Sequence, residues 1–242
     1  MMGFSLFVLI LNLLQKRKLS SYNLGLLAIF FVLFLIMKLS FEPMLLLLFL
    51  IPFKKIDGKF PNYVKKIALL LTIILLGYFI AKSSFFISAS NYTHHPKGVN
   101  PVLQMQYILH NPAHYMQIFT QSTVHLAKFH IQGMIGLFGW LDYSLDWWAY
   151  VLFIGTGIYV IYSVKPQKKE RMKLWQILLI FSSMFLSYAF MMTIFYLNWK
   201  KVGSLVIDGT QGRYFLSLLS FIMLGLVQLK THIPQRPKPR SM

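Results

Sequence analysis

Long apolar runs separated by short basic segments set the pattern of this chain. Shorter runs at 1–15 and 43–53 accompany runs long enough to cross a bilayer as helices, at 22–37, 64–81, 147–164, 174–197 and 214–229. We expect Glu42-Pro43 to end the helix 22–37, since proline disfavours helical geometry in the residue before it. The run 43–53 covers only about 16 Å of a core of about 30 Å, which indicates a short buried span or a half-helix. The pattern predicts an all-α, polytopic transmembrane bundle of about 6–7 membrane helices, one of them short.

The region 83–146 contains no convincing single span and is rich in histidine and glutamine. After Pro112, helical spacing gives one mainly apolar side, formed by Tyr115, Ile118, Phe119, Ser122, Leu126 and Phe129. The opposite side carries the polar residues His114, Gln117, Gln121, His125 and Lys128. We therefore expect an amphipathic helix that lies along the membrane interface or lines a wet cavity.

Composition indicates a membrane protein. Hydrophobic residues make up 57% of the chain, charged residues make up 12%, and the mean hydropathy is +0.60. We expect residues 1–230 to form a single transmembrane helical domain. The chain has no cysteine, which excludes disulfides and thiolate metal sites. The formal charge of +18 comes mostly from clusters between apolar runs, a distribution that signals membrane topology and not nucleic-acid binding.

The basic clusters set the expected orientation. They lie at 16–18, 54–66, 165–173 and 230–240. By the positive-inside rule, the side that holds all of them is cytoplasmic, so 83–146 becomes a large extracytoplasmic loop region. The loop 198–213 then also faces outward, and 231–242 is expected to be a basic, disordered cytoplasmic tail. The sequence predicts a multi-pass protein of the cell membrane with its chemistry on the outer face.

Charge, glycine and aromatic residues meet at the end of loop 198–213, in the run DGTQGRYF. Gly209 and Gly212 permit a tight turn whose amide groups can face a ligand. Arg213 offers a planar set of donors suited to phosphate or carboxylate. Asp208 can act as a base or pair with Arg213. In the structural alternative, these two charges simply neutralise each other at a helix start.

A second candidate patch, GLFGWLD at 136–142, follows the amphipathic helix. Trp140 can stack on a sugar while the carboxylate of Asp142 accepts its hydroxyls or a proton. Asp146, four residues later, is expected instead to cap the helix that starts at Trp147.

The remaining polar and small residues favour structural roles. The histidines lack the spacing of zinc motifs and are expected to bond loop backbone, so neither a metal nor another cofactor is expected. Close helix packing is the expected role of the small residues Gly133, Gly136, Gly139, Gly155 and Gly157.

The run QGRYF at 211–215 and the block at 136–142 resemble signatures of a bacterial membrane-protein family catalogued as domain of unknown function 2142. The resemblance covers most of the chain from about Ser21 to Lys230. The family is similar in outline to C-type glycosyltransferases, polytopic enzymes that use lipid-linked sugars. Full-length members are longer and carry an acidic, histidine-containing motif in an early external loop. That motif is not found here, so we expect this chain to be a C-terminal half.

The resemblance implies part of a cell-envelope, glycosyltransferase-like protein that uses a polyprenyl-phosphate-linked sugar in polysaccharide chemistry outside the cell. The substrate-binding residues would be Gln211, Gly212, Arg213, Tyr214 and Trp140, and the catalytic residues Asp208 and Asp142. The alternative is a non-catalytic accessory membrane subunit or a truncated remnant. The expected partners are the lipid bilayer, a polyprenyl-phosphate sugar and a separate polypeptide that supplies the N-terminal half.

Overall fold

The computed structural model describes residues 2–16, 18–37, 39–51, 72, 98–138, 143–167 and 171–232. Helices make up nearly all of the regular structure in these ranges. The elements in chain order are α1 (Met2–Gln15), α2 (Ser21–Met37), the 3₁₀ helix η1 (Leu39–Leu50), α5 (Pro101–His110), α6 (Pro112–Ile135), β1 (Leu137–Phe138), β2 (Tyr143–Ser144), α7 (Trp147–Ser163), α8 (Leu174–Trp199), the 3₁₀ helix η5 (Gly212–Phe215) and α9 (Leu216–Lys230).

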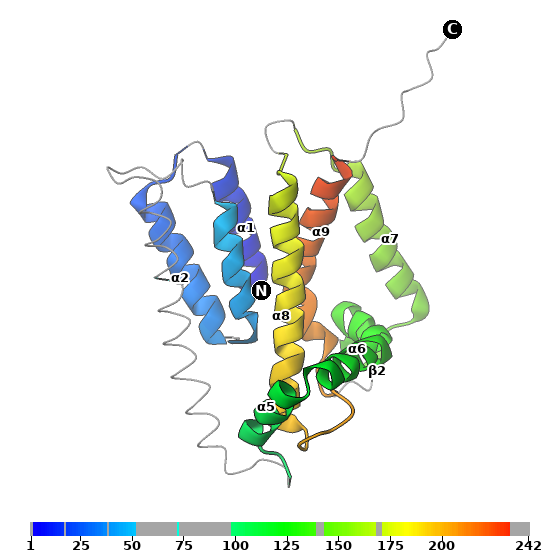
Figure 1. The fold of residues 1–242 in the computed structure, drawn as a ribbon. Helices are drawn as coiled ribbons and strands as arrows, with labels where there is room; N and C mark the ends of the chain where they lie inside the picture. The colour runs from blue at the N-terminus through cyan, green and yellow to red at the C-terminus, as the bar shows by residue number, and fades with distance from the viewer. Residues whose placement is uncertain are drawn as a thin grey trace.

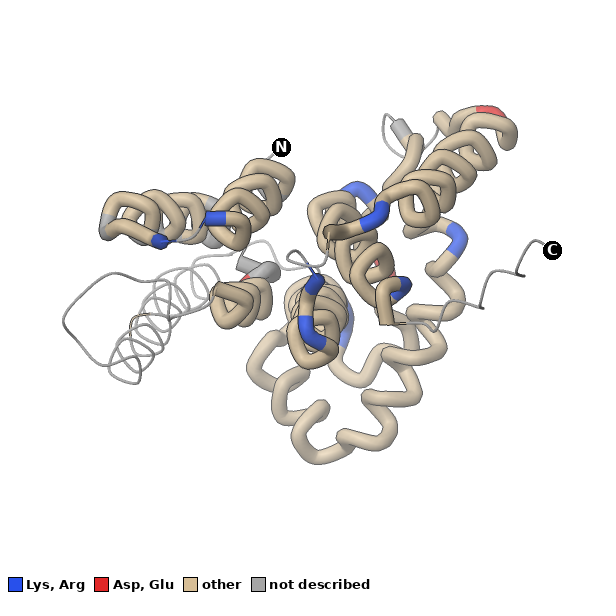
Figure 2. Tube along the Cα trace, turned by 90° about the horizontal axis from the view of Figure 1, so that it is seen from above, with Lys and Arg blue, Asp and Glu red and all other residues tan. Residues whose placement is uncertain are grey.

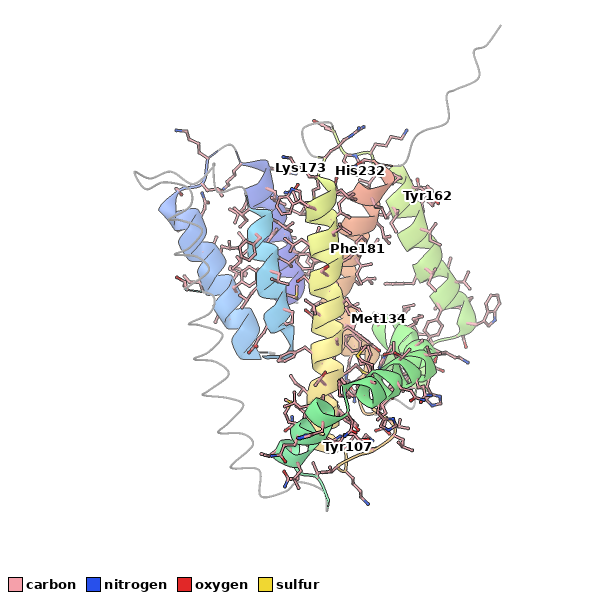
Figure 3. All side chains as sticks on the ribbon, viewed as in Figure 1. Tyr107, Met134, Tyr162, Lys173, Phe181 and His232 are labelled. Carbon is pink, nitrogen blue, oxygen red and sulfur yellow. The ribbon has the colours of Figure 1, made fainter. Side chains whose placement is uncertain are left out.

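Helix α8 stands at the centre of a group of upright helices, and α5 and α6 run across one end of that group (Figure 1). With 26 residues, α8 is about 39 Å long, more than a hydrocarbon core of about 30 Å. Tyr162, Lys173 and His232 lie at one end of the upright helices and Tyr107 at the other (Figure 3). We call these the basic end and the loop end.

Apolar side chains spaced three or four residues apart form the core between the upright helices. On α1, Leu6, Ile10 and Leu13 recur at this spacing and are buried. The ring of Phe7 meets that of Phe221 on α9 edge to face, with centroids 5.1 Å apart. The apolar side of α1 therefore packs against α9, the last described helix of the chain.

The short apolar run at 43–53 forms part of η1, and its buried leucines pack along α8. The described part of the run, 43–51, is thus mostly helical and buried in the fold, and residues 52–53 lie outside the described residues. The expectation that Glu42-Pro43 ends the preceding helix is wrong, because α2 already stops at Met37 and Pro43 lies inside η1. The carbonyl oxygen of Pro43 accepts a hydrogen bond from Ser183 Oγ of α8 (2.8 Å), so this residue belongs to the η1–α8 interface.

By length and composition, two helices of the described residues can cross a membrane, Leu174–Trp199 and Gly212–Lys230. Phe4–Gln15 and Trp147–Ser163 are apolar but shorter. The expected span 64–81 lies outside the described residues, apart from Thr72. The mainly helical architecture agrees with the prediction, whereas the number of about 6–7 membrane helices is not established by these ranges.

Helix α7 lies at the edge of the fold and buries none of its residues. It is tied at both ends. At the loop end, Tyr150 Oη donates to the Gly136 carbonyl oxygen (2.8 Å). At the basic end, Lys230 Nζ donates to the carbonyl oxygens of Ile161, Tyr162 and Val164. Asp146 occupies the N-cap position of α7 as predicted, although its side chain makes no capping hydrogen bond.

The predicted amphipathic helix is confirmed as α6. Ile118, Phe119 and Ser122 of its expected apolar side are buried, and the other three members of that side are half-buried. All five residues of the expected polar side are exposed. The buried side of α6 therefore faces the protein, where it meets the loop between α8 and η5.

Seen along the upright helices, most of the described lysine and arginine residues lie at helix ends and in connecting segments (Figure 2).

Candidate functional site

The connection from α8 to η5, residues 200–211, is fixed to the helices beside it. Gln104 Oε1 of α5 accepts from the Gly203 amide (2.9 Å), and Ser122 Oγ of α6 accepts from the Ile207 amide (2.9 Å). Further on, the Thr210 hydroxyl meets the His130 ring of α6. The partners on α5 and α6 follow in the same order as the loop residues. The loop therefore runs alongside these two helices, in the same direction.

The contact between His130 and Thr210 is the most buried part of this arrangement. His130 Nε2 and Thr210 Oγ1 are 2.9 Å apart, with exposed fractions of 4% and 0%. Tyr188 Oη of α8 lies 3.4 Å from His130 Nδ1. The Phe215 ring of η5 closes the site, with its centroid 5.1 Å from the imidazole. Burial lowers the pKa of His130 below its ordinary value of 6.5, which keeps the ring neutral.

Gly212 and Gly133 bring the backbones of η5 and α6 into contact. A Cβ atom added to Gly212 would collide with the His130 carbonyl oxygen and would lie 2.7 Å from the Met134 nitrogen. One added to Gly133 would lie 2.9 Å from the Gly212 nitrogen. The packing role predicted for Gly133 is thus confirmed. At Gly155, nothing among the described residues lies within 4 Å of such an atom, so the same role stays a prediction there.

The two glycines of the signature run serve different purposes. Gly209 has a φ of +88°, a left-handed conformation that other residues rarely adopt. Gly212 has no such conformation but is buried against α6. The left-handed conformation is therefore found at Gly209, in an irregular stretch, while the tight 3₁₀ turn begins at Gly212, which also packs closely on α6.

Asp208 forms an ion pair with Lys200, and its side chain remains substantially exposed. The alternative in which Asp208 and Arg213 neutralise each other is therefore not what the structure shows. The reason is local, because Lys200 stands directly at the end of α8, where the loop turns back past it. A surface pair of this kind contributes only about 0–1 kcal/mol. Its main consequence is that Asp208, the acidic residue nearest to Arg213 in the sequence, is already paired with Lys200.

Arg213 lies at the first turn of η5, just where the chain enters its last apolar helix. Its side chain is exposed and makes no ion pair or hydrogen bond with the described residues. Beside it, Gln211 has a buried Oε1 that accepts no hydrogen bond from them. Tyr214 is half-buried, with its ring centroid 6.0 Å from that of Phe195. Of the predicted substrate-binding residues, Gln211, Gly212, Arg213 and Tyr214 are thus brought together on one short segment.

The other predicted site residues, Trp140 and Asp142, lie outside the described residues, as does Gly139. The ends of their block form a small antiparallel hairpin that the all-helical pattern did not predict, with Leu137 opposite Ser144 and Phe138 opposite Tyr143. Within the part of the chain that the structure describes, no group of three or more histidine and acidic side chains is placed to hold a metal ion.

Sequence reasoning missed the contact between His130 and Thr210. A signal was present, because His130 follows Ser122 and Leu126 at intervals of four on the apolar side of α6. A histidine on such a side requires a buried partner. The partner was not visible in the sequence because it lies 80 residues away, in an irregular loop.

This arrangement defines a class of protein: a helical membrane protein in which a loop, bound along an amphipathic helix, presents an exposed arginine at the start of an apolar helix. The chain belongs to the family described as "Predicted membrane protein (DUF2142)", whose sequence model matches residues 1–222, as the resemblance of its signatures predicted. No curated protein and no solved structure matches the chain.

Proposed function

We propose that this chain is part of a cell-envelope, glycosyltransferase-like membrane protein that takes a polyprenyl-phosphate-linked sugar on the outer face of the membrane. Arg213 binds the lipid phosphate. The observation that carries this proposal is the exposed guanidinium of Arg213, which has no carboxylate partner among the described residues. Its planar set of donors suits a phosphate, and two parallel hydrogen bonds to charged oxygens are strong and specific.

The position of Arg213 matches where a lipid phosphate would lie. The helical segment Gly212–Lys230 is apolar and long enough to cross a membrane, and Arg213 is its second residue. A side chain at the boundary of such a helix reaches the headgroup region, and the apolar tail of the same lipid would lie along the membrane core. Because Gly212 packs closely on α6, the backbone that carries the guanidinium is held in place.

The orientation follows from the positive-inside rule. The basic end carries Lys16, Arg171, Lys173 and Lys230, in or beside segments that connect apolar helices, which favours a cytoplasmic location. The loop end then faces outward, as required for a donor assembled across the membrane. In this proposal the tail 231–242 is cytoplasmic.

The sugar-handling groups are proposed on chemistry alone. Gln211 and Tyr214 flank Arg213 and offer polar atoms to the phosphate or the first sugar. Asp208 or Asp142 serves as the base for the acceptor, and Trp140 stacks on a sugar face. For Asp208 to act in this way, it must leave its ion pair with Lys200.

The test is binding of a polyprenyl phosphate to purified protein in lipid nanodiscs. Arg213→Ala should weaken saturable binding by roughly 10- to 100-fold, because charge-assisted hydrogen bonds contribute about 1.5–3 kcal/mol. Arg213→Lys should retain part of the affinity, since it keeps the charge but not the planar geometry. Lys201→Ala removes an exposed cation from the same loop and should bind like the wild type. Unchanged affinity in Arg213→Ala would remove the basis of the proposal.

A non-catalytic accessory membrane subunit is the second candidate. The Lys200–Asp208 ion pair favours it, because a neutralised carboxylate is a poor base and here closes a loop. In that case the signature run only connects α8 to α9 and has no role in binding or catalysis. The protein would then act with the bilayer and a separate membrane polypeptide, and would show no saturable affinity for the lipid phosphate.

A further inference from the structure

His130 connects residues 200–211, which we call the signature loop, to helices α6 and α8. The residue sits on α6, three positions before the Gly133 contact with η5. Its ring meets Thr210 of the loop, Tyr188 of α8 and Phe215 of η5. Thr210 lies between the left-handed Gly209 and the packed Gly212, so the His130–Thr210 contact holds the loop three residues before Arg213.

The hydrogen-bond partners indicate which nitrogen of the neutral His130 ring carries the hydrogen. The Thr210 hydroxyl donates to Met192 Sδ (3.3 Å), which leaves Thr210 Oγ1 to accept the hydrogen of His130 Nε2. His130 Nδ1 then carries the lone pair that faces the Tyr188 hydroxyl at 3.4 Å. The Tyr188 hydroxyl also reaches Thr123 Oγ1, 3.4 Å away. Neutral imidazole therefore has a hydrogen-bond acceptor at Nε2 and a hydroxyl group beside Nδ1.

A second proton on His130 would place a positive charge in a buried site that has no carboxylate partner among the described residues. The groups that face the ring are the phenol of Tyr188, the hydroxyl and backbone of Thr210, and the aromatic ring of Phe215. The charged residues on the surrounding segments are Lys128 on α6, Arg213 on η5 and the Lys200–Asp208 pair, and none of them contacts His130. Burial lowers the pKa of the ring, and the hydrogen bond to the Thr210 backbone, the smaller effect, offsets only part of this.

We propose that His130 is a positioning residue whose neutral ring holds the signature loop against α6, and that protonation of His130 in mild acid releases the loop. Released, the loop no longer presents Arg213 in a fixed place. Anion binding therefore weakens as the pH falls. This last consequence rests on the function proposed above for Arg213, whereas release of the loop does not.

Thiol labelling of the loop tests the proposal without any ligand. The chain has no cysteine, so single substitutions give unique thiols. Ile207→Cys places a thiol at a buried position of the loop, and Leu205→Cys places one at an exposed position two residues earlier. Thiol reactivity itself depends on pH, so the measured quantity is the ratio of the two labelling rates across about pH 5–8.

The expected result is a labelling ratio that rises as the medium becomes more acidic. With the pKa lowered in the closed loop and ordinary in the released loop, opening increases roughly tenfold per pH unit below about 6.5, until the lowered pKa is reached. The non-titrating His130→Gln variant, which keeps a donor for Thr210, should show a flat ratio. Thr210→Val preserves shape but removes the hydroxyl, and should raise the ratio at neutral pH.

Three results would overturn the proposal: a flat ratio in the protein with His130 intact, an acid-induced rise that persists in His130→Gln, or a Thr210→Val loop as protected at neutral pH as the original. The first and third do not depend on whether His130→Gln folds. Failure of polyprenyl phosphate binding would leave the labelling result unaffected, so the two proposals fail separately.

Discussion

Replacing Gly212 with alanine is expected to lower the free energy of unfolding by about 3 kcal/mol, or to prevent stable folding altogether. The added methyl group would meet three backbone atoms of α6, namely the His130 carbonyl oxygen, the Met134 nitrogen and the Gly133 carbonyl carbon. Backbone inside a helix cannot move aside as the end of a flexible side chain can. The η5 segment must therefore separate from α6, and the buried His130–Thr210 contact would be disturbed with it.

The matched control for this prediction is Gly155→Ala. Gly155 lies inside α7, and nothing among the described residues lies within 4 Å of an added Cβ atom. Alanine is favoured over glycine in helices by about 1 kcal/mol, so this variant should be as stable as the original or more so. Thermal unfolding of both proteins in the same detergent gives the comparison. A Gly212→Ala protein with the wild-type midpoint would show that α6 and η5 are not in backbone contact.

The same glycine shows what the sequence could reveal and what it could not. Spacing and composition predicted α2, α6, α7, α8 and α9, because periods of three to four residues and apolar length are local properties. The signature run was recognisable, and the left-handed conformation of Gly209 agrees with the backbone freedom expected of glycine there. The role of Gly212 was not, since a close approach to α6 depends on a partner 79 positions earlier, Gly133. Local sequence does not encode such a distance.

The charged residues of the site show a similar limit. Asp208 was expected to act as a base or to pair with Arg213, its nearest arginine in the sequence. Instead it pairs with Lys200, because α8 ends there and the loop returns past that end. His130 was passed over although it lies on the apolar side of α6. Its burial became interpretable only once Thr210 and Tyr188 were placed around it.

Replacing Lys230 with methionine is expected to cost about 2–3 kcal/mol and to loosen the end of α7. Lys230 Nζ donates to the carbonyl oxygens of Tyr162 (2.9 Å) and Val164 (2.7 Å), and also to that of Ile161. These groups have no partner within α7 because they close its last turn, where the helix dipole also favours a cation. Methionine has a similar length and apolar stem, so the change isolates the charge and its donors.

Hydrogen exchange of the last turn of α7 would measure this effect most directly, because α7 buries none of its own residues and depends on ties at its ends. Faster exchange at 161–164 with a lower thermal midpoint is expected in Lys230→Met. Lys165→Met is the control, since it removes an exposed charge from the same end of the molecule and leaves the three hydrogen bonds from Lys230 to α7 in place. Equal protection in the two variants would mean that packing against α9, and not Lys230, holds α7 in place. In that case α7 would remain attached through its packing against α9 and through the hydrogen bond from Tyr150 to Gly136 at the loop end.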